Sequence, residues 1–405
     1  MILTQCAVCA TELGTGGKKC GRCQTRYCGP ECQVQHWKEG GHDKLCKIIK
    51  KAGGAEQYHA DEKCKEAVAV AVETCADDTK GQTCYICTQA VHWKTKEGLV
   101  RMCACRGTAG FAHVSCLAEQ AKILIEEAEE NNLDHKVMNE RWQRWSSCSL
   151  CKQQYHGVVM GALGWACWKT YVGRPETDNS RLGSMKVLGR SFRDSGRAED
   201  ELAVHQATLD TFKRYWQGDD EDQNALDVMS NMAGCYSRLG QHDKCVTMRR
   251  EIYARRVATL GFSDEESLNE AHCIALDLVN RPDRDSQTEA KEFLRDIMPR
   301  ALADLGPEHL TYLRFRWVYA FALHDDDAAA TLDDMIEAEA TYVAIERVYA
   351  RRFGNSHPET CGLRGEISKV RERIAKVRKC AATCEDPSCR WTQIARRSGI
   401  HPNAR

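Results

Sequence analysis

Apolar residues recur at helical spacing along the chain from about residue 181 onward, and short polar turns separate these stretches. Glycines mark the turns at near-regular intervals. Two of them lie 44 residues apart, and four others follow one another at spacings of 43, 45 and 48 residues: Gly196 and Gly240, then Gly218, Gly261, Gly306 and Gly354. A period of this length, with two amphipathic helices in each unit, is typical of an α-solenoid and less so of a plain helical bundle. We expect helix–turn–helix repeats over residues 181–376 and a tail over 377–405.

Two stretches before the repeats also carry helical patterns. Residues 51–80 are rich in Ala, Glu and Lys, which favours a connecting helix, although their "AVAVAV" run also fits a strand. Residues 157–172 are the most apolar stretch, but a lysine interrupts them and they are fewer than the roughly 20 residues of a membrane-spanning helix. We therefore expect no membrane segment, and a junction over 157–180 with Trp165 and Trp168 in its core.

Cysteine is the unusual component of the sequence. The 405 residues include 24 cysteines, and sixteen of them precede residue 152. Such density indicates disulfides or metal sites. The opening "MILTQCAVCA" does not have the basic segment and apolar run of a secretory signal, so we expect a reducing compartment, the cytoplasm or the nucleus. In that setting, paired cysteines predict zinc ligation.

The first cysteine block, within residues 1–50, offers eight ligands for two tetrahedral sites. Its cysteines are Cys6, Cys9, Cys20, Cys23, Cys28, Cys32 and Cys46. The eighth ligand is a histidine. His36 lies four residues after Cys32, so local geometry leaves it open. His42 precedes Cys46 by four residues, which places both side chains on one helical face. This spacing favours His42.

The second block, within residues 81–156, repeats the same count of seven cysteines and one histidine. These residues are Cys84, Cys87, Cys103, Cys105, His113, Cys116, Cys148 and Cys151. Both blocks therefore hold enough ligands for two zinc ions each, about four ions in all.

The first block resembles the MYND zinc finger in its order of ligands, with "RYCGPECQVQHW" followed by His-x3-Cys. The resemblance implies two interleaved sites and a module that docks short proline-containing peptides. It also implies a mainly structural role for His36 and Trp37. The implied ligand sets are Cys6, Cys9, Cys28 and Cys32 for site one, and Cys20, Cys23, His42 and Cys46 for site two.

The second block resembles the RING-CH domain, most closely in "CRGTAGFAHVSCL" and "CSLCKQQY". The resemblance implies a ubiquitin ligase in which Ile86 contacts a conjugating enzyme. Gln120 departs from it, since a tryptophan is usual there, and "LAEQAKILIEEAEENN" is an inserted helix. The implied ligand sets are Cys84, Cys87, His113 and Cys116 for site three, and Cys103, Cys105, Cys148 and Cys151 for site four.

The repeats resemble tetratricopeptide repeats, with Ala233, Tyr236 and Gly240 of "NMAGCYSRLGQHDKC" at the expected packing and turn positions. Their period above 40 residues is similar to that of kinesin light chains. One unit departs from the pattern, because "VNRPDRDSQ" (279–287) stands where a glycine turn is expected.

The sequence thus predicts a mostly α protein, with two small zinc-stabilised modules followed by an α-solenoid of helix–turn–helix repeats. We expect an interaction scaffold that docks peptides or proteins; the second hypothesis is a RING-CH-type ubiquitin ligase that recruits a conjugating enzyme, so enzyme activity stays open. A net charge of −1 and the absence of a basic stripe argue against nucleic acid and membrane as partners. The tail holds three more cysteines without a fourth ligand: Cys380, Cys384 and Cys389.

Overall fold

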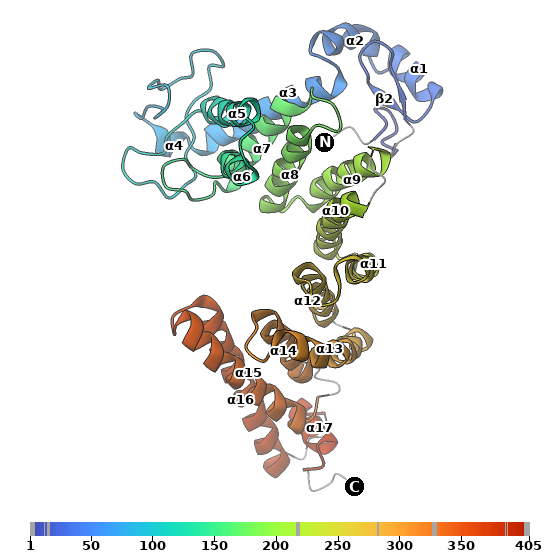
Figure 1. Ribbon diagram of the computed structural model, residues 1–405, viewed down its shortest axis with the longest axis vertical. Helices are drawn as coiled ribbons and strands as arrows, with labels where there is room; N and C mark the ends of the chain where they lie inside the picture. The colour runs from blue at the N-terminus through green and yellow to red at the C-terminus, as the bar shows by residue number, and fades with distance from the viewer. Residues whose placement is uncertain are drawn as a thin grey trace. The chain divides into compact units, whose positions relative to one another are not determined.

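A computed structural model of the chain describes residues 5–11, 13, 17–215, 219–281, 283–325, 330–384, 386 and 388–400 (Figure 1). The chain divides into two compact units, Met1–Leu239 and Gly240–Arg405. The fold class predicted from the sequence is confirmed: the protein is mostly α-helical, with cysteine-rich modules before a series of helix–turn–helix repeats. The domain boundaries predicted above stay predictions, because this division cuts the chain only once.

The amino-terminal module has little regular structure. Two short strands, β1 (Lys18–Lys19) and β2 (Arg26–Tyr27), pair antiparallel with Lys18 opposite Tyr27. Helices α1 (Pro30–Lys38) and α2 (His42–Lys51) follow and pack against each other. Cysteines make up half of the residues in the buried core of the module, which are Cys6, Leu13, Cys20, Cys23, Tyr27, Cys46, Ile49 and Ala55. So small an apolar core does not offset the entropy of folding without a cross-link or a metal.

Helix α3 (Ala55–Thr74) takes up the "AVAVAV" run, so the helical alternative is the one that forms. Its buried residues include Ala60, Cys64 and Ala71, which share one face at helical spacing. These small side chains let α3 pack closely along α7 (Gly157–Tyr171). A strand of the same sequence would have turned alternate residues away from that contact. The short helix α4 (Ala76–Thr79) follows.

The second cysteine block contains one long helix. Isolated bridges pair Val100 with Ala112 and Ser147 with Gln154. The expected inserted helix is α5 (Val114–Glu130), which begins next to the histidine of the block and packs on α7. Two further elements lead to the last knuckle: α6 (His135–Trp142) and η1 (Gln143–Trp145).

Helix α7 is the centre of the first unit, because α3, α5 and α8 (Asn179–Asp194) all pack against it. Trp165 and Trp168 are buried, as predicted. A Cβ added at Gly164 would lie 2.7 Å from the Cβ of Ser191, so this glycine allows α7 and α8 to approach closely. Helices α9 (Ala198–Tyr215) and α10 (Asp219–Arg238) complete the unit. Within the described residues, no helix combines the length and apolar composition needed to cross a membrane.

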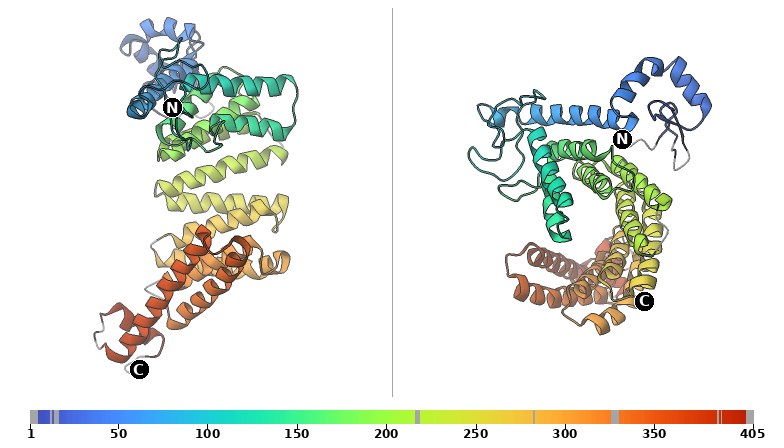
Figure 2. Two further views of the ribbon diagram at one scale, coloured as in Figure 1. Left: turned by 90° about the vertical axis from the view of Figure 1, so that its left-hand side faces the viewer. Right: turned by 45° about the horizontal axis from the view of Figure 1, so that its top comes forward.

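The second unit is a succession of helices in which each packs against the next (Figures 1 and 2). Its core is continuous and apolar, with residues such as Leu294, Leu313 and Leu363 fully buried. The helices are α11 (His242–Leu260), α12 (Glu265–Val279), α13 (Arg284–Leu305), α14 (Leu310–Asp325), α15 (Leu332–Phe353), α16 (Pro358–Thr383) and α17 (Arg390–Arg397).

The glycine series has one geometric cause. Gly261, Gly306 and Gly354 follow α11, α13 and α15 directly, with φ of 91°, 83° and 91°. L-residues rarely adopt such a φ, so each repeat needs a glycine to leave its second helix in the same direction. Gly218 lies outside the described residues. The "VNRPDRDSQ" turn uses a cap instead, because the Asp283 carboxylate accepts a hydrogen bond from the Ser286 amide.

Candidate metal centres

The four Cys-x2-Cys pairs of the two blocks share one backbone conformation. In each, the amide of the first cysteine donates to the carbonyl five residues later, at 2.8 to 2.9 Å. The residue four positions after that cysteine donates back to its carbonyl and has a positive φ: Ala10, Gln24, Thr88 and Lys152, at 57° to 63°. This tight turn aims both sulfurs to the same side, as two ligands of one ion require.

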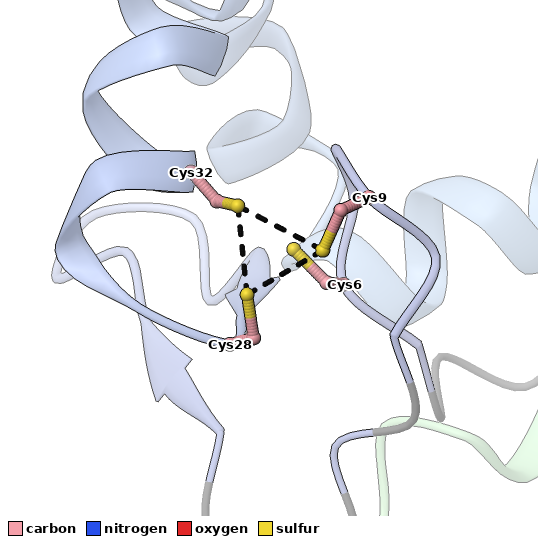
Figure 3. Close-up of side chains that lie close together, drawn as sticks. All are labelled: Cys6, Cys9, Cys28 and Cys32. Atoms are coloured by element: carbon pink, nitrogen blue, oxygen red, sulfur yellow. Dashed lines mark hydrogen bonds between the residues drawn. The ribbon is translucent and has the colours of Figure 1, made fainter.

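Site one brings together Cys6, Cys9, Cys28 and Cys32 (Figure 3). The Sγ of Cys9 lies 3.5 Å from that of Cys28 and 3.8 Å from that of Cys32, and the Cys28 and Cys32 sulfurs are 3.5 Å apart. Four sulfurs around a tetrahedral zinc at about 2.3 Å would lie roughly 3.8 Å from one another. A disulfide would instead require about 2.0 Å. The spacing therefore fits a metal ion held between thiolates.

Site two is fully buried and contains Cys20, Cys23, His42 and Cys46. The Cys20 and Cys46 sulfurs are 3.9 Å apart, and His42 Nε2 lies 3.4 Å from the Cys23 sulfur. His42 and Cys46 lie one turn apart on α2, which turns both toward the Cys20–Cys23 pair. The four ligand atoms lie within 4.8 Å of one another.

His36 has a different environment from His42. Its Nδ1 lies 2.9 Å from the Tyr27 hydroxyl, and its ring stacks on the His42 ring at a centroid distance of 4.8 Å. The two glycines before His42 allow this arrangement. A Cβ at Gly40 would clash with the His36 ring, and Gly41 has a φ of 70°. The chain can therefore turn sharply and start α2 at His42.

Two thiols of site two, those of Cys20 and Cys46, differ in pKa because their surroundings differ. Burial raises the pKa of Cys20, but the His42 ring and the amides of Arg22 and Cys23 outweigh burial and lower that pKa to about 6. Burial and the sulfurs of Cys23 and Cys20 raise the pKa of Cys46 to about 11. Protein groups alone thus do not keep the Cys46 sulfur deprotonated at neutral pH. A divalent cation bound at this site would keep the sulfurs deprotonated, since it attracts every thiolate.

Site three contains Cys84, Cys87, His113 and Cys116. It uses the other ring nitrogen of its histidine, because His113 Nδ1 lies 3.3 Å from the Cys87 sulfur and 3.6 Å from the Cys116 sulfur. The Nε2 of His113 lies 3.4 Å from the Ala90 carbonyl, to which it can donate its proton. Such a donation fixes the tautomer that leaves Nδ1 free to bind a metal.

Site four contains Cys103, Cys105, Cys148 and Cys151, with the Cys105 and Cys148 sulfurs 3.7 Å apart. Gly110 lies against this group with a φ of 85°. A Cβ there would lie 2.7 Å from the Cys105 Cβ and 3.1 Å from the Cys103 sulfur. This position therefore admits only glycine if the four sulfurs are to meet.

The structure brings the sixteen residues into the same four groups that the two resemblances imply, and each group has a donor set that could hold zinc. Ile86 is 37% exposed. Leu150 holds the same place in the last knuckle and is 50% exposed, a correspondence that sequence reasoning missed. Trp37, for which a mainly structural role was expected, is 44% exposed, so much of its ring faces solvent.

A fifth turn has the knuckle conformation without cysteines. The His92 amide donates to the Glu97 carbonyl at 3.0 Å, Lys96 donates back to His92 at 2.9 Å, and Lys96 has a φ of 61°. His92 Nδ1 lies 2.8 Å from the Thr95 hydroxyl, so the two ligand positions bond to each other. The five turns have no residue type in common at the position of positive φ, which is occupied by Ala10, Gln24, Thr88, Lys152 and Lys96. The sequence therefore has no pattern that would predict the fifth turn.

The same turn forms one wall of a cleft of about 1170 Å³ beside α3, α5 and α7. Trp93 lines the cleft and is 69% exposed, the largest exposure among the exposed apolar side chains described. The turn from His92 to Glu97 has the knuckle conformation without cysteines, and it therefore lines a cleft instead of presenting cysteine ligands to a metal.

Comparison with protein families identifies the first module. Residues 6–46 match the MYND finger, a span that begins and ends on residues of sites one and two. This match implies zinc binding by the amino-terminal module. It does not extend to the second block, whose likeness to RING-CH domains stays a prediction.

Solved structures similar to this chain include helical-repeat proteins. Two are crystal structures of nearly identical TPR-like repeats from a Podosopora anserina protein described as a putative kinesin light chain, one of them with a single substitution. The substituted form is 18% identical to this chain with a TM-score of 0.40, and the match covers 59% of this chain and 97% of the other. The second form is also 18% identical, with a TM-score of 0.39, and the match covers 60% of this chain and 98% of the other. BtubC (BKLC) from P. vanneervenii is 11% identical with a TM-score of 0.35, covering 68% and 95%. The comparison with curated proteins gives no match.

Proposed function

We propose that this protein is a zinc-binding interaction scaffold whose MYND finger docks a short proline-containing peptide. One observation carries the proposal. The two helices of the finger turn apolar side chains to solvent while their other faces hold ligands. These side chains, 37% to 54% exposed, are Val34 and Trp37 on α1 and Leu45 and Ile48 on α2.

The proposed docking surface rests on site two. The Trp37 ring meets the His42 ring edge-on at a centroid distance of 5.8 Å, so the ion that would orient His42 also supports Trp37. Proline-rich segments dock against exposed aromatic rings because their extended conformation is already formed before binding. A partner of that chemistry would cover Trp37 at little entropic cost.

We propose four zinc ions, one in each group of four ligands. Thiolate and imidazole are the donors that structural zinc prefers, and every group offers four of them. The helical repeats would add a second recognition surface for protein segments, as is usual for α-solenoids.

The docking proposal can be tested with proline-rich peptides selected on the full chain from a display library. Trp37→Ala should weaken binding of a selected peptide roughly 30-fold, the change that a hot-spot loss of about 2 kcal/mol produces. Val70→Ala is the matched control, because Val70 is 50% exposed on α3. Equal binding by the wild type and Trp37→Ala, or selected peptides without proline, would contradict the proposal.

Recruitment of a ubiquitin-conjugating enzyme is the second candidate function. It is favoured by Ile86 and Leu150, which are exposed at the same position of two knuckles. Gln120 argues against this function, because a tryptophan is usual at its position in RING-CH domains. Autoubiquitination assays with a panel of conjugating enzymes decide the question: chains that the wild type forms and Ile86→Ala does not would support a ligase.

A further inference from the structure

Three cysteines outside the two zinc-type blocks meet near the carboxyl end of the second unit. The sulfurs of Cys380, Cys384 and Cys389 all lie within 4.8 Å of one another, and those of Cys380 and Cys389 are 3.9 Å apart. This is the sulfur spacing found at sites one, two and four. It is about twice a disulfide bond length. The three residues are partly exposed, so an ion could reach them from solvent.

Two helix ends create the cluster. Cys380 and Cys384 lie one turn apart at the end of α16, and their backbones are joined by a hydrogen bond of 3.1 Å. Cys389 is the residue just before α17, where the helix dipole favours a thiolate. The carboxyl end of α16 favours a cation in turn.

We propose that Cys380, Cys384 and Cys389 bind a thiophilic d10 cation, Zn²⁺ or Cu⁺. Three thiolates suit either ion. Zn²⁺ would complete its tetrahedron with a ligand from solvent, whereas Cu⁺ is satisfied by three sulfurs. A three-thiolate zinc centre carries a charge of about −1, and the adjoining residues Lys379 and Arg390 are both basic.

The ion would fasten the last helix of the repeat array. Ile394 and Ala395 of α17 are fully buried, and the Ser398 hydroxyl accepts a hydrogen bond from the Leu332 amide at 2.7 Å. The segment from α17 to Ser398 therefore contacts the amino-terminal start of α15 as well as packing on α16. Coordination would hold the start of α17 to the end of α16.

The test is metal analysis of the full chain, loaded with Zn²⁺ in one arm and with Cu⁺ under anaerobic conditions in the other. We expect Cys384→Ser to hold one ion fewer per chain than the wild type in at least one arm. Cys361→Ser is the matched control, because Cys361 is an exposed cysteine on the same helix, outside the cluster. Equal metal content of the wild type and Cys384→Ser in both arms would overturn the proposal.

A second measurement needs no substitution. In the metal-loaded wild type, a chelator should accelerate the alkylation of Cys380 and Cys389 and leave that of Cys361 unchanged. Hydrogen exchange of the α17 amides should accelerate at the same chelator concentration. Alkylation at Cys380 that is indifferent to metal would refute the site even if Cys384→Ser fails to fold. Neither outcome depends on the MYND finger, so the docking proposal stands or falls separately.

Discussion

The amino-terminal finger and the carboxyl-terminal repeats are held together by different physical means. In the finger, half of the buried core is cysteine, and the strands have only two residues each. In the repeats, helices of up to 26 residues share a continuous core of Leu, Ile, Val, Ala and Tyr. The first region depends on a few strong bonds to an ion, and the second on many weak apolar contacts.

This difference teaches where each region is vulnerable. A cross-linked module fails when one ligand or its ion is lost, since nothing else offsets the entropy of its loops. A stacked array loses stability gradually, in proportion to the apolar area and packing removed. The second cysteine block is intermediate, because α5 packs on α7 and gives it apolar support that the finger does not have.

Removal of zinc should produce the largest effect. Structural zinc contributes about 10–16 kcal/mol in isolated fingers. A strong chelator should therefore unfold the loops of residues 6–46 and 84–113 while α11 to α16 stay helical. Hydrogen exchange followed by mass spectrometry measures both regions at once. Protection of the finger that survives chelation would show that the finger does not depend on a metal ion for its stability.

A cavity in the repeats should have the next largest effect. Leu313→Ala removes a fully buried side chain of α14 and should lower the free energy of unfolding by about 2–5 kcal/mol. Leu302→Ala, at a position 39% exposed on α13, should change it by less than about 0.5 kcal/mol. Denaturant unfolding followed by circular dichroism compares the pair. Zinc content should be equal in both, and a loss of zinc in Leu313→Ala would couple the two regions.

Acid should weaken the repeats through His324. Burial and the charge of Arg373 lower the pKa of His324 to about 4, and its ring bonds to the Tyr342 hydroxyl at 3.1 Å and to Arg373 at 3.2 Å. The unfolded chain, with a histidine pKa near 6.5, binds the proton first. Stability is therefore full above pH 6.5 and declines as the pH falls toward 4, by roughly 3 kcal/mol at most.

His324→Asn should make the free energy of unfolding fall less steeply between pH 6.5 and 4, because the asparagine does not titrate. The reduction in slope should correspond to about one proton fewer taken up on unfolding. The measurement is the free energy of unfolding of α14 to α16 at both pH values, from hydrogen exchange in denaturant. Parallel slopes for the variant and the wild type would show that another group causes the decline.

A glycine exchange should produce the smallest effect and should change sign with position. Gly354→Ala meets no atom within 4 Å but has a φ of 91°, so it should destabilise by about 1 kcal/mol through the backbone alone. Gly365→Ala, inside α16 and equally free of contacts, should stabilise by roughly 0.5–1 kcal/mol. Thermal unfolding of the two variants is sufficient. Stabilisation by Gly354→Ala would remove the conformational reason for the glycine series.

Much of the fold could be predicted, because local rules produce much of it. The Cys-x2-Cys turns need only five or six consecutive residues, and the repeat period follows from a positive φ at one residue per unit. The position of α5 was foreseen, but its burial against α7 was not. Packing between helices depends on side chains far apart in the chain, such as Gly164 and Ser191, and no spacing rule connects them.

The sequence by itself determined the kinds of ligand, the knuckles that present them and the periodic helices, since each depends on neighbours within a turn or two. Only the tertiary structure decided that His113 turns Nδ1 toward the sulfurs, because the Ala90 carbonyl that faces its Nε2 lies 23 residues earlier in the chain. It also decided that three tail cysteines meet where α17 packs on α16, because their sequence spacing alone does not bring Cys389 to Cys380.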